Sequence, residues 1–183
     1  MKVKYIYSAC IEIETKDIRV LTDPWFTEGA YDGSWYHFPK IEDPFSLISE
    51  PDYIYVSHIH PDHYDPCFLK RLFEKWGQKP ILIPKFEKNY LKFKMITDGF
   101  SPLEIDSFSL GKTHLHITPN FTGSPSDIDS SLIVESEGKI LLNLNDCIWN
   151  DSHVKANQKI IKDYGHRELD LLCLGYTLSL IHI

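Results

Sequence analysis

Long apolar runs, clusters of basic residues and closely spaced cysteines are all missing from this chain of 183 residues. No segment approaches the roughly 18 apolar residues that a membrane-spanning helix needs, which excludes a membrane as partner. The net charge is −7, from 26 acidic and 19 basic side chains, and no basic stripe offers a surface for nucleic acid. We therefore expect a small-molecule substrate as the partner, whereas the sequence does not set the oligomeric state.

Cysteines are few, and none form a C-x-x-C pair. They are Cys10, Cys67, Cys147 and Cys173. This spacing excludes the paired-cysteine motifs of zinc and redox sites, so we interpret the residues as free, buried thiols in a reducing compartment. The first residues, MKVKYIYSACIEIE, become acidic too soon for a signal peptide. The predicted location is cytoplasmic.

No internal repeat, low-complexity tract or Pro/Gly/Ser linker divides the chain. Hydrophobic residues make up 43% of the sequence and charged residues 25%, which is typical of a globular protein. The length of 183 residues fits one domain that buries most of the surface exposed by the unfolded chain.

The C-terminal segment LSLIHI departs from this pattern, because it follows a convincing strand and ends without a helix or a polar terminus. By the genetic code, this hexapeptide is what the end of a widely used transposon-based sequencing adapter encodes in one reading frame. We therefore expect a domain over residues 1–177 that is incomplete at its C-terminus, and a non-native tail over residues 178–183. A genuine short apolar terminus is the alternative.

Alternating and β-branched segments predict a series of strands with helices outside them, an α/β fold with mixed sheets. The strands are expected in KYIYSACIEIE, IRVLTDPWF, DYIYV, PILIP, PLEID, THLHITP, SSLIVES, KILLNLND and LDLLCLGY. The first two form a hairpin that turns near residues 16–17. One helix begins with Asp65 as N-cap before a proline and ends at Gly77. A last helix is expected over roughly residues 152–164.

Histidines are crowded directly after the predicted strand DYIYV, where His58, His60, Asp62 and His63 lie close together. On an extended chain His58 and His60 point to the same side, and Pro61 then turns the chain so that Asp62 and His63 return beneath them. Imidazole and carboxylate together suit zinc, iron or manganese. Two histidines for one ion and an Asp-His pair for a second predict a binuclear centre. A His-rich polar loop would explain neither this spacing nor the preceding strand.

The H-x-H-x-D-H pattern resembles the signature of the metallo-β-lactamase superfamily. VLTDPWF, which contains Asp23, resembles the superfamily's early DP strand. ILLNLNDC resembles its second metal motif, which implies Asp146 as a bridging ligand. SACIEIE, LTDPWF, GSWYHFP and NLNDC are most similar to the branch of the ascorbate-6-phosphate lactonases and the catalytic domain of CMP-N-acetylneuraminate hydroxylase. The resemblance implies a four-layer αββα sandwich, with the metals at one edge between two sheets.

Two ligands depart from the superfamily pattern. The usual third histidine of the first ion corresponds to Phe121, within the run TPNFT. Nearby residues that could substitute are His114, His116, Asp127 and Asp129. Each has a plainer alternative, as a strand histidine or a turn-forming aspartate. The final histidine of the second ion would lie beyond the native part of this chain, and His182, in the suspected tail, is not assigned.

Several other residues keep two interpretations. Asp23 would either orient a metal-bound histidine or only form a turn before a proline. Trp25, Trp35 and Tyr36 would either line a substrate pocket or pack in the interior. Surface positions are expected for His37 and His153.

The resemblance implies a metal-dependent hydrolase with two divalent ions, zinc, manganese or iron. Cations bridged by Asp146 and a water would lower the pKa of that water from roughly 15.7 toward about 7. The metal-bound hydroxide would attack an ester, lactone or phosphoester, such as that of a sugar derivative, with Asp62 binding metal and steering the water. One alternative is an iron-dependent oxygenase related to CMP-N-acetylneuraminate hydroxylase, although the Rieske pattern C-x-H and C-x-x-H is absent. The other is a degenerate, non-catalytic binding protein, which Phe121 favours.

Overall fold

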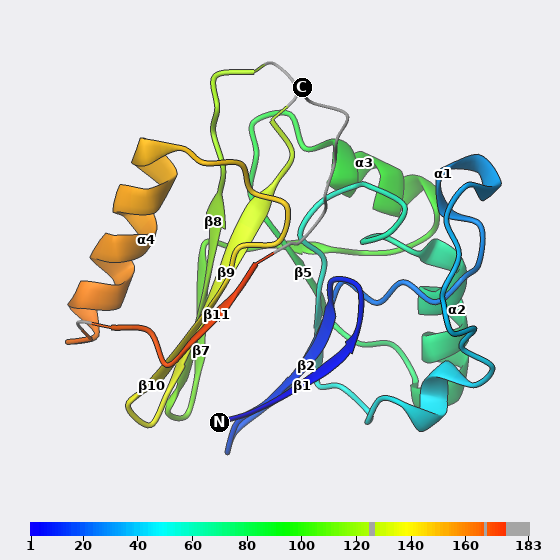
Figure 1. Cartoon of the computed structure of the whole chain (residues 1–183), viewed down its shortest axis with the longest axis horizontal. Coiled ribbons are helices and arrows are strands. Elements are labelled where there is room, and N and C mark those ends of the chain that lie inside the picture. Colours follow the sequence, from blue (N-terminus) through cyan, green and yellow to red (C-terminus); the bar gives the residue numbers. More distant parts are fainter. Residues whose placement is uncertain (125–126, 167, 175–183) are drawn as a thin grey trace.

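The computed structural model describes residues 1–124, 127–166 and 168–174, which form two facing β-sheets with helices on their outer sides (Figure 1). The suspected tail over residues 178–183 and the expected domain end at residue 177 lie outside the described residues. No helix in the described part of the chain is long and apolar enough to cross a membrane.

The first sheet has the strand order β1-β2-β3-β4-β5-β6. The strands are β1 Lys2–Tyr7, β2 Cys10–Glu14, β3 Arg19–Thr22, β4 Tyr53–Tyr55, β5 Ile81–Ile83 and β6 Leu103–Glu104. Strands β1 to β3 pair antiparallel, whereas β3 to β6 pair parallel. Parallel neighbours need crossover connections, which contain α1 Ala30–Gly33, the short 3-10 helix η1 Pro44–Ser46, α2 Pro66–Trp76 and α3 Tyr90–Thr97.

The second sheet has the order β11-β10-β9-β8-β7. Its strands are β7 Ser107–Leu110, β8 Thr113–Pro119, β9 Ser130–Ser136, β10 Lys139–Asn143 and β11 Leu171–Cys173, and α4 Asp151–Asp163 covers its outer face (Figure 1). The β9–β10 hairpin turns at Glu137 and Gly138, which both have positive φ, +51° and +76°. Two-residue hairpin loops favour this conformation because it matches the twist of the strands.

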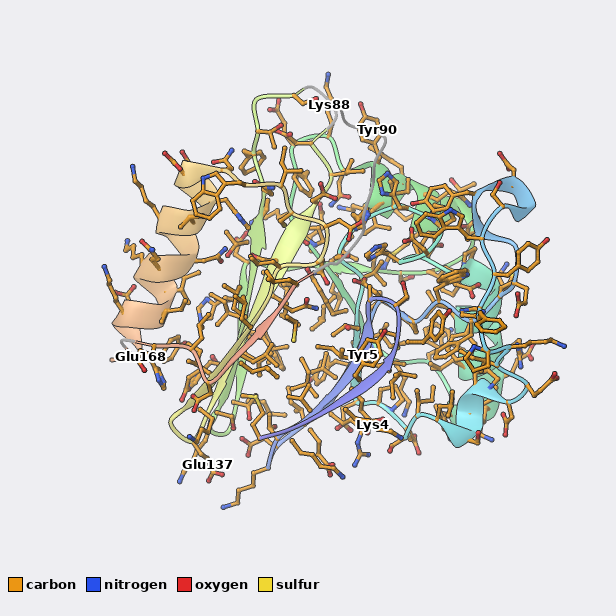
Figure 2. The ribbon with its side chains drawn as sticks, in the orientation of Figure 1. Lys4, Tyr5, Lys88, Tyr90, Glu137 and Glu168 are labelled. Carbon is orange, nitrogen blue, oxygen red and sulfur yellow. The ribbon has the colours of Figure 1, made fainter. Side chains whose placement is uncertain are left out.

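The core forms in layers because successive strand residues point to opposite faces of a sheet. Ile54 packs toward α2 against Phe68 and Leu72, whereas its neighbour Tyr55 faces the second sheet and Val134. A third cluster lies between the second sheet and α4. Side chains fill the space between the sheets (Figure 2). The fold is therefore the four-layer αββα sandwich that the resemblance implied.

Several local predictions are confirmed and others are wrong. Asp65 caps α2 by accepting a hydrogen bond from the backbone N–H of Phe68 at 2.8 Å, as predicted. The segment KYIYSACIEIE is not one strand but two, because the chain turns at Ser8, where φ is +49°. Helix α3 and strand β7 were not predicted.

Some predictions for isolated residues are also wrong. All four cysteines are free, yet only Cys10 is fully buried and Cys67 is exposed. His37 and His153 are 4% and 5% exposed, not surface residues. His153 belongs to α4, and its ring faces the second sheet, with Nε2 2.9 Å from the hydroxyl of Ser131 on β9. Polar partners inside the fold make these burials tolerable, and short sequence patterns do not reveal such partners.

Candidate metal centre

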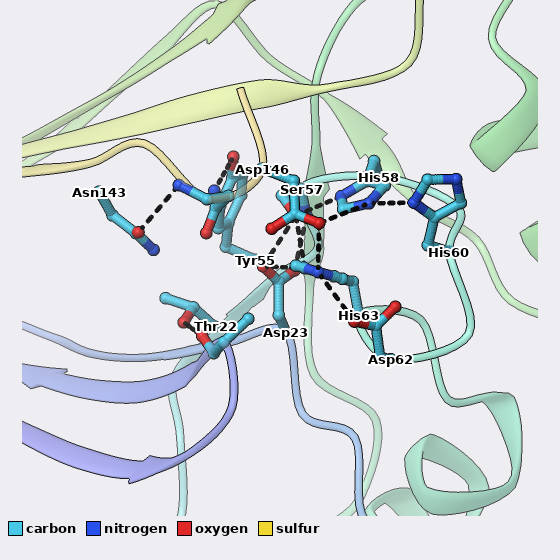
Figure 3. Close-up of polar contacts among 12 residues, drawn as sticks. Thr22, Asp23, Tyr55, Ser57, His58, His60, Asp62, His63, Asn143 and Asp146 are labelled. Carbon is cyan, nitrogen blue, oxygen red and sulfur yellow. Dashed lines mark hydrogen bonds and ion pairs between the residues drawn. The ribbon is translucent and has the colours of Figure 1, made fainter. Parts of the chain in front are cut away.

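Imidazole and carboxylate groups from both sheets meet at one edge of the sandwich (Figure 3). Ligand atoms of His58, His63 and Asp146 all lie within 4.8 Å of one another. Oδ2 of Asp146 is 3.4 Å from Nε2 of His63 and 4.0 Å from Nε2 of His58. The structure thus brings together the segment around residue 60 and residue 146. The predicted metal site depends on this proximity.

The histidine loop turns back on itself immediately after β4. The backbone N–H groups of His63 and Tyr64 both donate to the carbonyl of His60, at 3.0 and 2.8 Å. This turn returns Asp62 and His63 to the first histidines, and Nδ1 of His60 lies 2.8 Å from Nε2 of His58. His58, Asp62 and His63 are all buried.

Asp23 follows β3 and supports this loop from beneath. Its carboxylate accepts hydrogen bonds from the backbone N–H and the hydroxyl of Ser57, both at 2.7 Å. Its Oδ2 is also 3.0 Å from Nδ1 of His63. Because Nδ1 is engaged by Asp23, Nε2 of His63 is the nitrogen that faces Asp146. These contacts are those of an orienting carboxylate rather than of a simple turn former.

Asp62 is held by a partner that the sequence did not indicate. The hydroxyl of Tyr31 donates to Oδ1 of Asp62 at 2.7 Å, while Oδ2 lies 3.5 Å from Nε2 of His63. Burial and the carboxylate of Asp62 raise the pKa of Tyr31, so that its hydroxyl stays protonated and donates. Tyr31 lies in an aromatic loop without a recognisable motif, and only its contact with Asp62 identifies it.

Asp129 lies at the centre, whereas Asp127 does not. Oδ1 of Asp129 is 3.7 Å from Nε2 of His58 and is buried without a hydrogen-bond partner among the described residues. Asp127 instead accepts hydrogen bonds from the backbone of Thr122 and Gly123, which stabilise its own loop. A buried carboxylate oxygen without a hydrogen-bond partner beside an imidazole is the arrangement expected of a side chain that binds a metal ion.

His114 and His116 do not reach the centre. Nε2 of His116 is 2.9 Å from the hydroxyl of Tyr164, and the ring of His114 packs against the same tyrosine. Because side chains alternate along β8, these histidines lie on its outer face while Leu115 and Ile117 face the first sheet. The structure therefore does not support either histidine as a substitute for the one replaced by Phe121, which is 57% exposed.

The titratable side chains at the centre change one another's pKa values. Burial lowers the pKa of His63, but the charges of Asp23 and Asp62 and a bond with Asp146 raise it to about 10. Burial and the nearby His63 lower the pKa of His58. Burial and the charge of Asp146 raise the pKa of Asp129 to about 6. The carboxylates of Asp129 and Asp146 repel each other, and the neighbouring imidazole of His58 is kept uncharged, so these three side chains form a donor set that fits a divalent cation.

A cavity of about 510 Å³ opens beside the cluster, with Asp62, His63 and Asp146 in its wall. Its other walls come from the β1–β2 hairpin and from β10 and β11. A second hollow shares Tyr5 with this cavity and is bordered by Trp25, Trp35, Tyr36 and other aromatic side chains. Trp25 is buried, whereas Trp35 and Tyr36 are 41% and 61% exposed. The carboxylates of Asp62 and Asp146 thus line the first cavity, whereas the aromatic residues border the second.

Comparison with known proteins gives a consistent result. The family described as "Beta-lactamase superfamily domain" matches residues 2–166. Cytidine monophosphate-N-acetylneuraminic acid hydroxylase from Danio rerio is 29% identical over 150 residues, which cover 78% of this chain and 25% of the hydroxylase. The chain thus spans about a quarter of the length of that relative.

Two solved structures share the fold at low sequence identity. The diiron β-hydroxylase CmlA from Streptomyces venezuelae aligns with a TM-score of 0.67 and 17% identity, over 93% of this chain and 33% of CmlA. An isothiocyanate hydrolase from Delia radicum gut bacteria aligns with a TM-score of 0.66 and 17% identity, over 87% of this chain and 67% of the hydrolase. Because the family match covers residues 2–166, the chain belongs to the metallo-β-lactamase superfamily, in a branch similar to CMP-N-acetylneuraminic acid hydroxylase.

Proposed function

We propose that this chain holds two divalent metal ions and is a metal-dependent hydrolase of an ester, lactone or phosphoester, such as that of a sugar derivative. One observation carries the proposal: ligand atoms of His58, His63 and Asp146 lie within 4.8 Å of one another, although they come from different sheets. Two imidazoles and a carboxylate that converge in this way are the donor types that bind zinc, iron or manganese.

The ligands divide by their positions around Asp146. His58, His60 and Asp129 would hold one ion, since Nε2 of His58 lies next to a nitrogen of His60 and an oxygen of Asp129. Asp62 and His63 would hold the second ion, with Asp146 between the two. Zinc, manganese and iron all suit this mixture of imidazole and carboxylate.

The chain's own residues prepare the reaction. When bound, a divalent cation here supplies an acidified water and polarises an oxygen of the substrate. Tyr31 donates to Oδ1 of Asp62, so Oδ2, which lies beside Nε2 of His63, is the oxygen that would bind metal and orient a water. Asp23 keeps the ring of His63 fixed. The cavity beside Asp62 and Asp146 admits the substrate.

An iron-dependent oxygenase is the second candidate, and Asp129 is the observation that favours it. A carboxylate in place of a third histidine makes the first ion's ligand set harder, which suits iron. The relative from Danio rerio is a hydroxylase. Oxygen chemistry would also require an electron donor.

Elemental analysis of the purified full chain, combined with two activity assays, tests both candidates. Zinc or manganese with hydrolysis of a phosphodiester or lactone panel would support the hydrolase. Iron with consumption of oxygen would support the oxygenase. Metal-free, inactive protein would contradict both and favour a binding role. His58→Ala should lose metal, and Asp106→Asn, at an exposed site paired with Lys85, is the matched control.

A further inference from the structure

Tyr55 spans the interface between the two sheets. It ends β4, and its side chain is fully buried in the cluster that joins the sheets. Its hydroxyl lies 2.8 Å from Oγ of Ser130 and 3.2 Å from the Ser130 carbonyl, both at the start of β9. Nδ2 of Asn145, after β10, donates to the same hydroxyl at 3.3 Å and to the Ser130 carbonyl at 3.0 Å. A residue of the first sheet thus binds two segments of the second.

The hydrogen bonds of this network have a defined direction. The hydroxyl of Ser130 donates to the carbonyl of Ser57 at 2.8 Å, so its oxygen is left to accept from Tyr55. Tyr55 in turn accepts from the amide of Asn145. Each group therefore donates to the next one. The amide of Asn145 donates to Tyr55, Tyr55 donates to Ser130, and Ser130 donates to the carbonyl of Ser57.

Every partner in this network is the chain neighbour of a proposed ligand or its support. Ser57 precedes His58, and Ser130 follows Asp129. Asn145 precedes Asp146. In addition, the backbone carbonyl of Tyr55 accepts a hydrogen bond from the backbone N–H of Asp23 at 2.9 Å. Figure 3 shows Tyr55 among Asp23, Ser57 and Asp146.

Apolar contacts between sheets are non-directional, so they resist separation more than they resist a small relative shift. Hydrogen bonds depend steeply on distance and angle, and a buried phenol that loses its partners pays a large desolvation cost. The hydroxyl of Tyr55 is therefore suited to fix the end of β4 relative to the start of β9 and the segment after β10.

We propose that Tyr55 is a positioning residue that sets the distance between His58 of the first sheet and Asp129 and Asp146 of the second. The inference rests on the proposed metal centre. Tyr55, which is not one of the proposed ligands, would thus control how strongly those ligands bind an ion.

Tyr55→Phe tests the role, because it removes the hydroxyl and keeps the ring in the core. Tyr53→Phe is the matched control: Tyr53 lies on the same strand and packs against Phe108, and its hydroxyl has no hydrogen-bond partner in the part of the chain described. Co²⁺ is titrated into the metal-free full chain, and visible absorption reports both affinity and coordination. We expect Tyr55→Phe to bind Co²⁺ about 10–100-fold more weakly with an altered spectrum, and Tyr53→Phe to match the wild type. Equal affinity and spectrum for Tyr55→Phe would overturn the proposal.

Asn145→Ala is a second, independent test of the network in case Tyr55→Phe does not fold. It should weaken Co²⁺ binding and alter the spectrum in the same way. The double variant should bind no more weakly than Asn145→Ala alone, because both changes break one shared network. Losses that simply multiply would show that the two residues act separately and would overturn the coupling. If the wild type itself bound no Co²⁺, the metal centre would fail along with the role of Tyr55, whereas normal binding by both wild type and variants would refute only the latter.

Discussion

Oδ2 of Asp23 lies 3.0 Å from Nδ1 of His63, and both side chains are buried. The contact links the end of β3 to the histidine loop after β4, two parallel neighbours in the first sheet. It decides which nitrogen of His63 faces Asp146, and therefore which atom is available to an ion. The orientation of the proposed ligand thus depends on a residue far away in the sequence.

Asp23→Asn should weaken metal binding about 10–100-fold, because the amide cannot hold the imidazole as the carboxylate does. Competition with a chromogenic chelator measures the change. Asp106→Asn, an exposed aspartate paired with Lys85, should have no effect on affinity. Unchanged affinity in Asp23→Asn would mean that His63 needs no orienting partner.

Asp129→Ala should reduce the metal content, because it removes the carboxylate oxygen that lies 3.7 Å from Nε2 of His58. Asp127→Ala should retain the full metal content, since that carboxylate only stabilises the loop at Thr122 and Gly123. Elemental analysis of both variants after gel filtration measures the difference. The reverse ranking would exclude Asp129 as a ligand.

Asp65→Ala should destabilise the protein by about 3 kcal/mol, more than the loss of a helix cap, which costs about 1 kcal/mol. Beyond capping α2, the carboxylate accepts hydrogen bonds from the backbone N–H groups of Phe26 and Thr27, at 3.0 and 2.7 Å. Asp43→Ala, which removes the exposed cap of η1, should cost about 1 kcal/mol. Urea unfolding compares the two. Equal costs would show that the link to Phe26 and Thr27 contributes nothing.

Asp17 should make stability depend on acid pH. The hydroxyl of Thr113 and the backbone N–H of Lys112 donate to its carboxylate and hold its pKa below the usual value of 3.8. Since the folded pKa is the lower one, the stabilisation is present above pH 3.8 and is lost as the pH falls through the folded pKa. Melting temperatures of the wild type and Asp17→Asn should therefore converge on acidification. A constant difference across this range would contradict the assignment.

The tertiary structure shows which candidate residues reach the metal centre and which residue the sequence missed. Asp127 and Asp129 were both candidate ligands with a turn role as the alternative, and only the folded chain leaves one of them, Asp129, beside His58. Tyr31 carries no motif, and its role follows from a single contact with Asp62. His114 and His116 share one face of β8 because side chains alternate along a strand, but the sequence does not tell whether that face points toward the first sheet or away from it.

By itself the sequence determined the features that short-range chemistry encodes. The spacing from His58 to His63, the cap at Asp65 and the alternation along β9 and β10 each depend on neighbouring residues. Only the tertiary structure decided which distant groups meet. The distance from Asp146 to His63, the selection of Asp129 and the burial of Tyr55 between the sheets all depend on how two sheets pack. Packing is a property of the whole apolar core, and no local pattern carries it.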